Sequence, residues 1–184
     1  AWNVYPYFES GNIVISNSSG GGFFLVKSNA TDTTSPTAVC QNITLELDED
    51  GLASVSADNL DGGSSDDVGI TSFELNISTF TCNDIGDNEV ILTVFDAAGN
   101  SDSCDAIITI EDNILPSIIG QNITVNLEGN PSVTVAAEEV DNESFDNCSI
   151  VSLTLTPDTF TTVGTFDAVL EGIDDSGNMA SVTV

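Results

Sequence analysis

The chain is almost devoid of positive charge. Among its 184 residues Lys27 is the only basic side chain, and the sequence contains neither Arg nor His. Nucleic-acid binding depends on Lys and Arg to displace counterions from phosphates, so this class of function is excluded. Without His, a Ser or Cys nucleophile lacks its ordinary base, and without Arg there is no phosphate clamp. We therefore expect that the protein is not an enzyme.

Long apolar runs are also missing. No stretch approaches the roughly 20 apolar residues of a membrane-spanning helix, so no membrane insertion is expected. The hydrophobic fraction of 40% is nevertheless ample for packed cores.

Acidic residues, in contrast, are abundant. The chain has 30 Asp and Glu residues and a formal net charge of −29. Because internal cations are almost absent, the carboxylates must rely on water, ambient salt or bound metal to offset their mutual repulsion. Divalent cations are the obvious candidates.

One repeat covers most of the chain. A shift of 80 residues aligns the tetrapeptide QNIT at 41–44 with the same tetrapeptide at 121–124. After a two-residue deletion the alignment continues, and it pairs Gly99 and Asn100 with Gly177 and Asn178. Such internal similarity indicates two copies of one domain. We expect an N-terminal segment at 1–30, a first domain at 31–112 and a second domain at 113–184.

Within each copy, apolar residues recur at every second position, which is typical of β-strands. Ile43, Leu45 and Leu47 alternate with polar neighbours, and a turn at 48–51 leads into residues 52–57, which predicts a hairpin. Further strands are expected near 70–76, 79–82, 89–95 and 103–110. The pattern predicts an all-β protein built of tandem immunoglobulin-like antiparallel β-sandwiches.

The acidic loops carry the main chemical hypothesis. In such a sandwich, the second-to-third and the penultimate-to-last loops meet at the pole where the chain enters, and calcium prefers roughly six to eight oxygen ligands. The expected ligands are Asp32, Asp58, Asp61, Asp66 and Asp96 in the first copy and Asp112, Glu138, Asp141, Asp146 and Asp174 in the second. At the opposite pole of the first copy, the residues expected to face the second cluster are Asp48, Asp50 and Glu111.

The same residues allow a simpler interpretation. Acidic loops are often solvated turns, and Asp96 and Asp174 each begin the sequence Asp-x-x-Gly-Asn, in which a carboxylate accepts bonds from nearby backbone amides. Retention of several carboxylates at matching positions, with no cation beside them, favours calcium at one or both poles.

The four cysteines divide into two pairs. Cys40 and Cys104 align with Gly120 and Val182, so the second copy lacks both together, as expected if they form one disulfide in the first. In the loop-entropy model, closing a loop of about 65 residues stabilises a domain by roughly 4 kcal/mol. Such a bond suits an oxidising, extracellular environment.

Several segments resemble a known module. The stretches DTTSPTAVC at 32–40, SDDVGI at 65–70, TFTC at 79–82 and FDAAGN at 95–100 are similar to hyalin-repeat-like (HYR-like) modules of large bacterial surface adhesins. The resemblance covers residues 31–184. It implies a protein that is secreted or anchored at the cell surface, in which such modules often act as spacers.

This resemblance bears on the second cysteine pair. The resembling modules usually carry another disulfide, between the positions that Val68 and Cys82 occupy here. Cys148 aligns with Val68, so each copy has kept the opposite half. One interpretation is two buried free thiols. The other is a bond between Cys82 and Cys148, either from one molecule to another or across the two domains.

Aromatic residues and the chain ends suggest two alternatives. Trp2, Tyr5 and Tyr7 all lie at the start of the chain, and exposed Trp and Tyr typically form sugar-binding platforms.

Few residues follow Asn178, so the last strand is expected to be short. Either the domain is truncated there, or residues 1–30 act as an arm that adds a strand to a neighbouring molecule. Residues 1–30 are otherwise explained as the end of a preceding domain.

Together these patterns predict a non-enzymatic extracellular module with a structural or adhesive role. We expect a spacer or fibre element of a bacterial cell-surface protein, stiffened by calcium and a disulfide. Its expected partners are neighbouring domains of the same protein or identical subunits. The alternatives are a self-assembling extracellular filament subunit joined by strand addition, and a calcium-dependent carbohydrate-binding module that contacts surface glycans.

Overall fold

The computed structural model describes residues 2–5, 12–17, 23–27 and 32–184, with only the backbone described in the first three ranges. The described residues form an all-β structure with three short helical turns. The strands are β1 (Trp2–Tyr5), β2 (Asn12–Asn17), β3 (Phe23–Lys27), β4 (Ile43–Glu46), β5 (Leu52–Ser54), β6 (Ile70–Leu75), β7 (Thr79–Thr81), β8 (Gly86–Asp96), β9 (Ser101–Glu111), β10 (Val133–Thr134), β11 (Ile150–Thr156), β12 (Thr159–Phe160), β13 (Val169–Asp174) and β14 (Met179–Thr183). The helical turns are η1 (Ala57–Asn59), η2 (Cys82–Asp84) and α1 (Ala137–Val140).

The N-terminal segment contributes a small sheet of its own. Strands β1, β2 and β3 pair antiparallel in that order. The rest of the segment, and every side chain in it, lies outside the described residues, including those of Trp2, Tyr5 and Tyr7. The expectations of a strand-donating arm and of an aromatic platform therefore stay predictions.

The first repeat, residues 32–112, contains a four-stranded sheet and a two-stranded sheet. The larger has the order β4-β9-β8-β6, in which β4 runs parallel to β9 and the other pairs are antiparallel. The smaller pairs β5 with β7. Alternate residues of β8 and β9 point into the core, as period-two patterning requires. The buried apolar residues are Leu47, Val55, Leu60, Phe80, Val90, Leu92, Val94, Ala106, Ile108 and Ile110.

The hairpin expected at 43–57 is wrong. The turn itself exists, because the amide of Leu52 and that of Gly51 both bond within the loop that starts at Asp48. The strands on either side, however, separate: β4 pairs with β9, whereas β5 pairs with β7 in the other sheet. Local alternation predicted both strands, but their partners depend on packing between distant parts of the chain.

The second repeat, residues 113–184, has its own core. Strands β11, β13 and β14 form one antiparallel sheet, and β10 pairs with β12. The buried apolar residues are Val135, Ala137, Val140, Leu155, Ala168 and Leu170. Residues 123–126, which align with β4, are not in a strand. The two repeats thus share the arrangement of their strands except at this edge.

The disulfide between Cys40 and Cys104 is present, as their joint absence from the second repeat predicted. The sulfur atoms lie 2.00 Å apart and the two Cα atoms 5.8 Å apart. Both cysteines pack against the first core. In the second repeat the side chains of Val184 and Val182 are the nearest to a Cβ added to Gly120, so two valines fill the space that the disulfide fills in the first.

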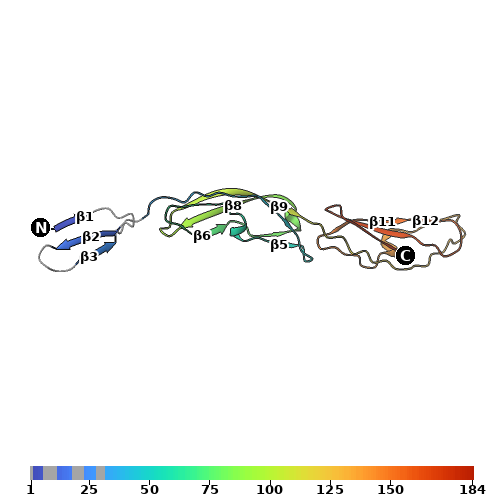
Figure 1. Ribbon diagram of the computed structural model, residues 1–184. Coiled ribbons are helices and arrows are strands. Elements are labelled where there is room, and N and C mark those ends of the chain that lie inside the picture. Colours follow the sequence, from blue (N-terminus) through green and yellow to red (C-terminus); the bar gives the residue numbers. More distant parts are fainter. Residues whose placement is uncertain (1, 6–11, 18–22, 28–31) are drawn as a thin grey trace.

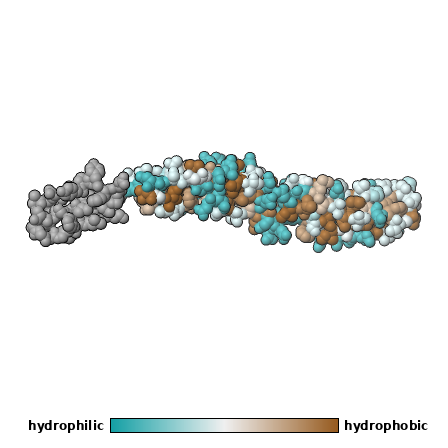
Figure 2. Space-filling model, viewed as in Figure 1, coloured by the Kyte–Doolittle hydropathy of each residue, from teal (hydrophilic) through white to brown (hydrophobic). Residues whose placement is uncertain are grey.

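The two repeats lie end to end in an elongated molecule (Figure 1), with β8 and β9 along the first and β11 and β12 in the second. On the face shown in Figure 2, hydrophilic and apolar residues alternate in small patches rather than forming one continuous apolar surface. Among the described residues, no helix is long and apolar enough to cross a membrane.

Candidate metal centre

Two equivalent contacts bring distant acidic residues together at the entry to each repeat. In the first, the incoming chain bonds to the loop after η1 through the pair Thr37 and Ser65. In the second, the pair Ser117 and Phe145 makes the same contact, again 80 residues later. The incoming chain carries Asp32 in the first repeat and Asp112 in the second. These residues therefore lie beside the aspartates at the end of the loop, Asp66 and Asp146.

Two groups of three acidic residues result. The entry cluster consists of Asp32, Asp66 and Asp67, and the junction cluster consists of Asp112, Asp146 and Asp174. In each group one carboxylate oxygen per residue lies within 4.8 Å of the others. The junction cluster is the more buried, because Asp112 is only 5% exposed and Asp174 only 1%.

Several oxygens in these clusters, and one on the neighbouring Asn147, are buried without a hydrogen-bond partner. They are Oδ2 of Asp32, Oδ1 of Asp66, Oδ2 of Asp112, Oδ1 of Asp146 and Oδ1 of Asn147. A buried polar atom without a partner is costly and unusual in a folded protein. A cation that takes these oxygens as ligands would remove that cost.

Electrostatics points the same way. Two like charges 4.8 Å apart repel by about 3 kcal/mol at an effective dielectric constant of about 20. Residues 32–184 contain no basic side chain that could offset this repulsion. The donors are all hard oxygens, which suits calcium better than a transition metal.

The Asp-x-x-Gly-Asn turn of the second repeat serves both proposed roles. The Oδ1 atom of Asp174 accepts a bond of 2.7 Å from the amide of Asn178, and Oδ2 accepts one of 2.8 Å from its side chain. The same Asn178 side chain donates to the backbone oxygen of Asp112. The turn therefore ties the last loop of the repeat to the incoming chain, while Asp174 remains part of the junction cluster.

Asp96 makes the equivalent turn but lies outside the entry cluster. Burial raises the pKa of Asp96, but bonds from the side chain and amide of Asn100 and from the amide of Ala98 outweigh this. The pKa of this carboxyl group therefore lies below its ordinary value of 3.8, and the group is ionised at neutral pH.

Other predicted ligands have local roles instead. Asp58 and Glu138 are exposed on the first helical turn of each repeat. The hydroxyl and amide of Ser64 hold the pKa of Asp61 below its ordinary value of 3.8, and Asp141 accepts from the corresponding Ser144. These four side chains cap their own loops or face solvent, so they lie outside both clusters.

The far pole of the first repeat also differs from the expectation. The Oδ1 atom of Asp48 accepts bonds from the amides of Asp50 and Leu52, so this carboxylate stabilises its own turn. Glu111 is exposed and accepts a bond of 3.4 Å from the side chain of Asn113. Asp48 does face the second repeat, but through its backbone oxygen, which accepts from Asn147 at 3.3 Å.

Sequence reasoning missed Asp67 and Asn147. These two residues occupy equivalent positions in the repeats, each directly after a clustered aspartate. The signal was therefore the alignment itself, which places an oxygen-bearing side chain at the same position in both copies. Asp67 is exposed, whereas Asn147 is half-buried at the junction.

The remaining cysteines join the two repeats. Cys82 and Cys148 form a disulfide with an S–S distance of 2.03 Å and a Cα–Cα distance of 5.5 Å. Neither cysteine is free, so the interpretation as free thiols is wrong, and so is that of a bond between molecules. The physical reason is the end-to-end placement, which brings η2 of the first repeat against the loop that precedes β11 of the second.

Gly51 marks how closely this junction is packed. Its φ angle is +71°, and an added Cβ would lie 2.7 Å from Sγ of Cys82 and 2.8 Å from the backbone oxygen of Asn147. Glycine is required here both by backbone conformation and by the approach of the second repeat.

We expect the Gly51→Ala variant to form the junction disulfide less completely than the wild type, as measured by mass spectrometry after thiol alkylation. Gly129→Ala is the matched control, since Gly129 also has a positive φ, of +82°, but nothing lies within 4 Å of its added Cβ. Both variants carry the backbone strain, of about 1–2 kcal/mol. Equal disulfide content in the two would show that the junction tolerates the extra methyl group.

No family model and no curated protein matches the chain.

Proposed function

We propose that the chain is a non-enzymatic structural module, a stiff spacer of tandem immunoglobulin-like sandwiches in an extracellular fibre or cell-surface protein. The observation that carries this proposal is the Cys82–Cys148 disulfide between consecutive repeats. Repeats joined by one peptide linker are expected to move relative to each other. A second covalent link opposes that motion, which serves a load-bearing rod and has no evident use in catalysis.

Other features support the same role. Two disulfides are typical of an oxidising, extracellular environment. The resemblance of residues 31–184 to HYR-like adhesin modules favours a bacterial cell surface. Acidic clusters at the start of each repeat would bind calcium between successive modules and add stiffness. Its partners in this role are adjoining domains of the same protein or identical subunits.

The proposal predicts a rigid junction that depends on the disulfide. In the wild type, residual dipolar couplings of both repeats should fit one alignment tensor, because a rigid rod orients as a single body. In a Cys82→Ser/Cys148→Ser variant each repeat should require its own alignment tensor. The couplings within each repeat should still fit the structure of that repeat. Two independent tensors in the wild type would refute the stiff-spacer function.

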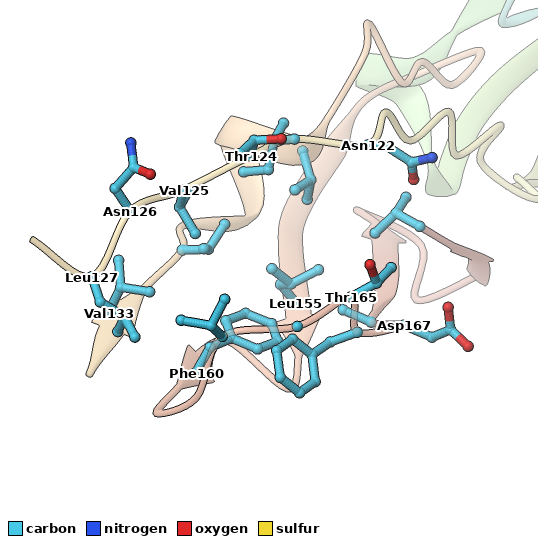
Figure 3. Close-up of a pocket in the computed structure, with 18 of the residues that line it drawn as sticks. Asn122, Thr124, Val125, Asn126, Leu127, Val133, Leu155, Phe160, Thr165 and Asp167 are labelled. Atoms are coloured by element: carbon cyan, nitrogen blue, oxygen red, sulfur yellow. The ribbon is translucent and has the colours of Figure 1, made fainter. Parts of the chain in front are cut away.

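A second candidate is a filament subunit joined by strand addition, and one observation favours it. In the first repeat residues 108–110 of β9 lie between β4 and β8, whereas in the second β14 pairs with β13 alone among the described strands, and an open groove of about 470 Å³ lies between 121–127 and 163–168. Figure 3 shows Leu127, Val133, Leu155 and Phe160 around this groove, while Asn126 points away from it. The lining, which mixes apolar and polar side chains, and the unpaired backbone suit an added strand.

In that scheme the strand comes from residues 1–30 of a neighbouring copy. Deletion of residues 1–30 should then abolish polymers in sedimentation velocity experiments. Polymers that persist after the deletion would rule out this arm as the donor. The carbohydrate-binding alternative rests on Trp2 and its neighbours, and a Trp2→Ala variant that loses binding on a glycan array would support it.

A further inference from the structure

We propose that the junction cluster is a divalent-cation site, completed by the side-chain oxygen of Asn147, and that Asn147 couples cation binding to the Cys82–Cys148 disulfide. This inference rests on the proposed stiff-spacer function and specifies the ligand that its junction binds. Calcium is the expected ion, because every available donor is a hard oxygen.

The free oxygens define the binding site. In Asp112, Oδ1 accepts bonds from the amide of Ile114 and the side chain of Asn147, while Oδ2 is buried with no partner. In Asp146, Oδ2 accepts from the amides of Cys148 and Ser149, while Oδ1 is buried with no partner. Each carboxylate is therefore held by one oxygen and leaves the other for a ligand.

Burial separates this site from an ordinary acidic surface. Asp112 is only 5% exposed, and it still carries an oxygen without a hydrogen-bond partner. Asp174 is more deeply buried and both its oxygens are engaged by Asn178, so it contributes charge and shape to the cluster. Three carboxylates hold a formal charge that one divalent cation would largely neutralise.

Asn147 connects this site to the first repeat. Its Nδ2 group donates to Oδ1 of Asp112 at 3.1 Å and to the backbone oxygen of Asp48 at 3.3 Å, and its own Oδ1 is buried without a partner. Its backbone oxygen lies 3.6 Å from Sγ of Cys82. The residue therefore stands between a cluster carboxylate on one side and the disulfide on the other.

The coupling follows from this position. When the disulfide is intact, Cys148 is fixed to the first repeat, and the adjacent Asn147 is held beside the cluster by its bonds to Asp112 and Asp48. When the disulfide is removed, the hydrogen bond between Asn147 and Asp48 is no longer held in place. Cation binding must then order Asn147, and the lost conformational entropy weakens the binding. By thermodynamic linkage, the cation in turn favours the closed junction.

Calcium titration by isothermal calorimetry at fixed ionic strength tests the site. The Asp112→Asn/Asp146→Asn variant should bind at the junction about 10-fold or more weakly than wild type. The charge-matched control is Asp58→Asn/Glu138→Gln, which removes two exposed carboxylates outside the clusters and should change the affinity less than about two-fold. Equal calcium affinities in the two variants would refute the proposed site. The binding would then reflect only nonspecific attraction of calcium to the negatively charged chain.

A double-mutant cycle tests the coupling. Cys82→Ser/Cys148→Ser should weaken calcium binding by about five-fold or more in the wild-type background. In an Asn147→Asp background, which keeps the side-chain oxygen but removes the Nδ2 donor, the same cysteine change should have less than about a two-fold effect. A cysteine effect of equal size in both backgrounds would refute coupling through Asn147.

These outcomes are distinct from failure of the proposed function. A single alignment tensor together with no calcium binding at the junction would retain the stiff spacer and remove the site. Tight calcium binding that depends on Asp112 and Asp146, together with two independent tensors, would retain the site and remove the stiff spacer.

Discussion

Replacing Cys40 and Cys104 together by alanine should lower the free energy of unfolding of the first repeat by about 4 kcal/mol. The bond joins residues 64 apart in sequence, so the variant regains the entropy of a long loop in its unfolded state. Alanine leaves little cavity, because the two cysteines are partly buried at the margin of the core rather than at its centre.

Urea unfolding monitored by amide NMR signals of each repeat gives the measurement. The midpoint of the first repeat should fall, while that of the second should stay near its wild-type value, because the second already lacks this bond. Cys82→Ala/Cys148→Ala is the comparison variant, since it removes a disulfide that closes a loop of similar length without opening either repeat. A loss below about 1 kcal/mol in the first repeat would mean that its unfolded state is already compact.

Removing divalent cations should lower the melting temperature by about 5–10 °C relative to a calcium-saturated sample. A ligand at 100 times its dissociation constant stabilises the folded state by about 2.7 kcal/mol, and each kcal/mol is worth about 2–4 °C in a chain of this size. Because extracellular calcium sites often have dissociation constants of about 0.1–1 mM, the titration should extend to about 10 mM.

Screening must be separated from binding in this experiment. A chain with a formal charge of −29 gains stability from any added salt, so the chelated sample should contain sodium chloride at the same ionic strength. The Asp112→Asn/Asp146→Asn variant should recover part of the lost stability without calcium, since it removes two of the three repelling charges. Melting curves that coincide with and without calcium would count against bound metal.

The parts of the fold that depend on local pattern could be predicted from the sequence. Alternation located β4, β5, β6 and β7 closely, and the 80-residue repeat located their counterparts in the second copy except at 123–126, which form no strand. The joint absence of two cysteines from the second repeat was enough to pair Cys40 with Cys104. In each case the contacts concerned lie within one repeat.

The parts that depend on placement could not be predicted in this way. Whether Cys82 meets Cys148 is decided by how the repeats abut, and alternation within a strand contains no information on that. Asp58 and Glu138 belong to the correct loops, but the helical turns direct them to solvent. Asp66 and Asp146 lie further along the same loops, where the incoming chain approaches, and so join the clusters.

The alignment did contain one unused signal. Asp67 and Asn147 occupy matching positions, but a carboxylate opposite an amide attracts no attention when only acidic residues are sought. Calcium accepts amide and backbone oxygens as well as carboxylates, so a search for oxygen-bearing side chains at equivalent positions would have found both.

Anomalous scattering from calcium in a crystal of the oxidised protein tests the central claim most directly. A peak is expected within about 2.3–2.6 Å of Oδ2 of Asp112 and Oδ1 of Asp146, where the structure leaves buried oxygens without partners. A calcium-soaked crystal with no anomalous peak between these carboxylates, and with water in contact with both oxygens, would contradict a metal-bound junction.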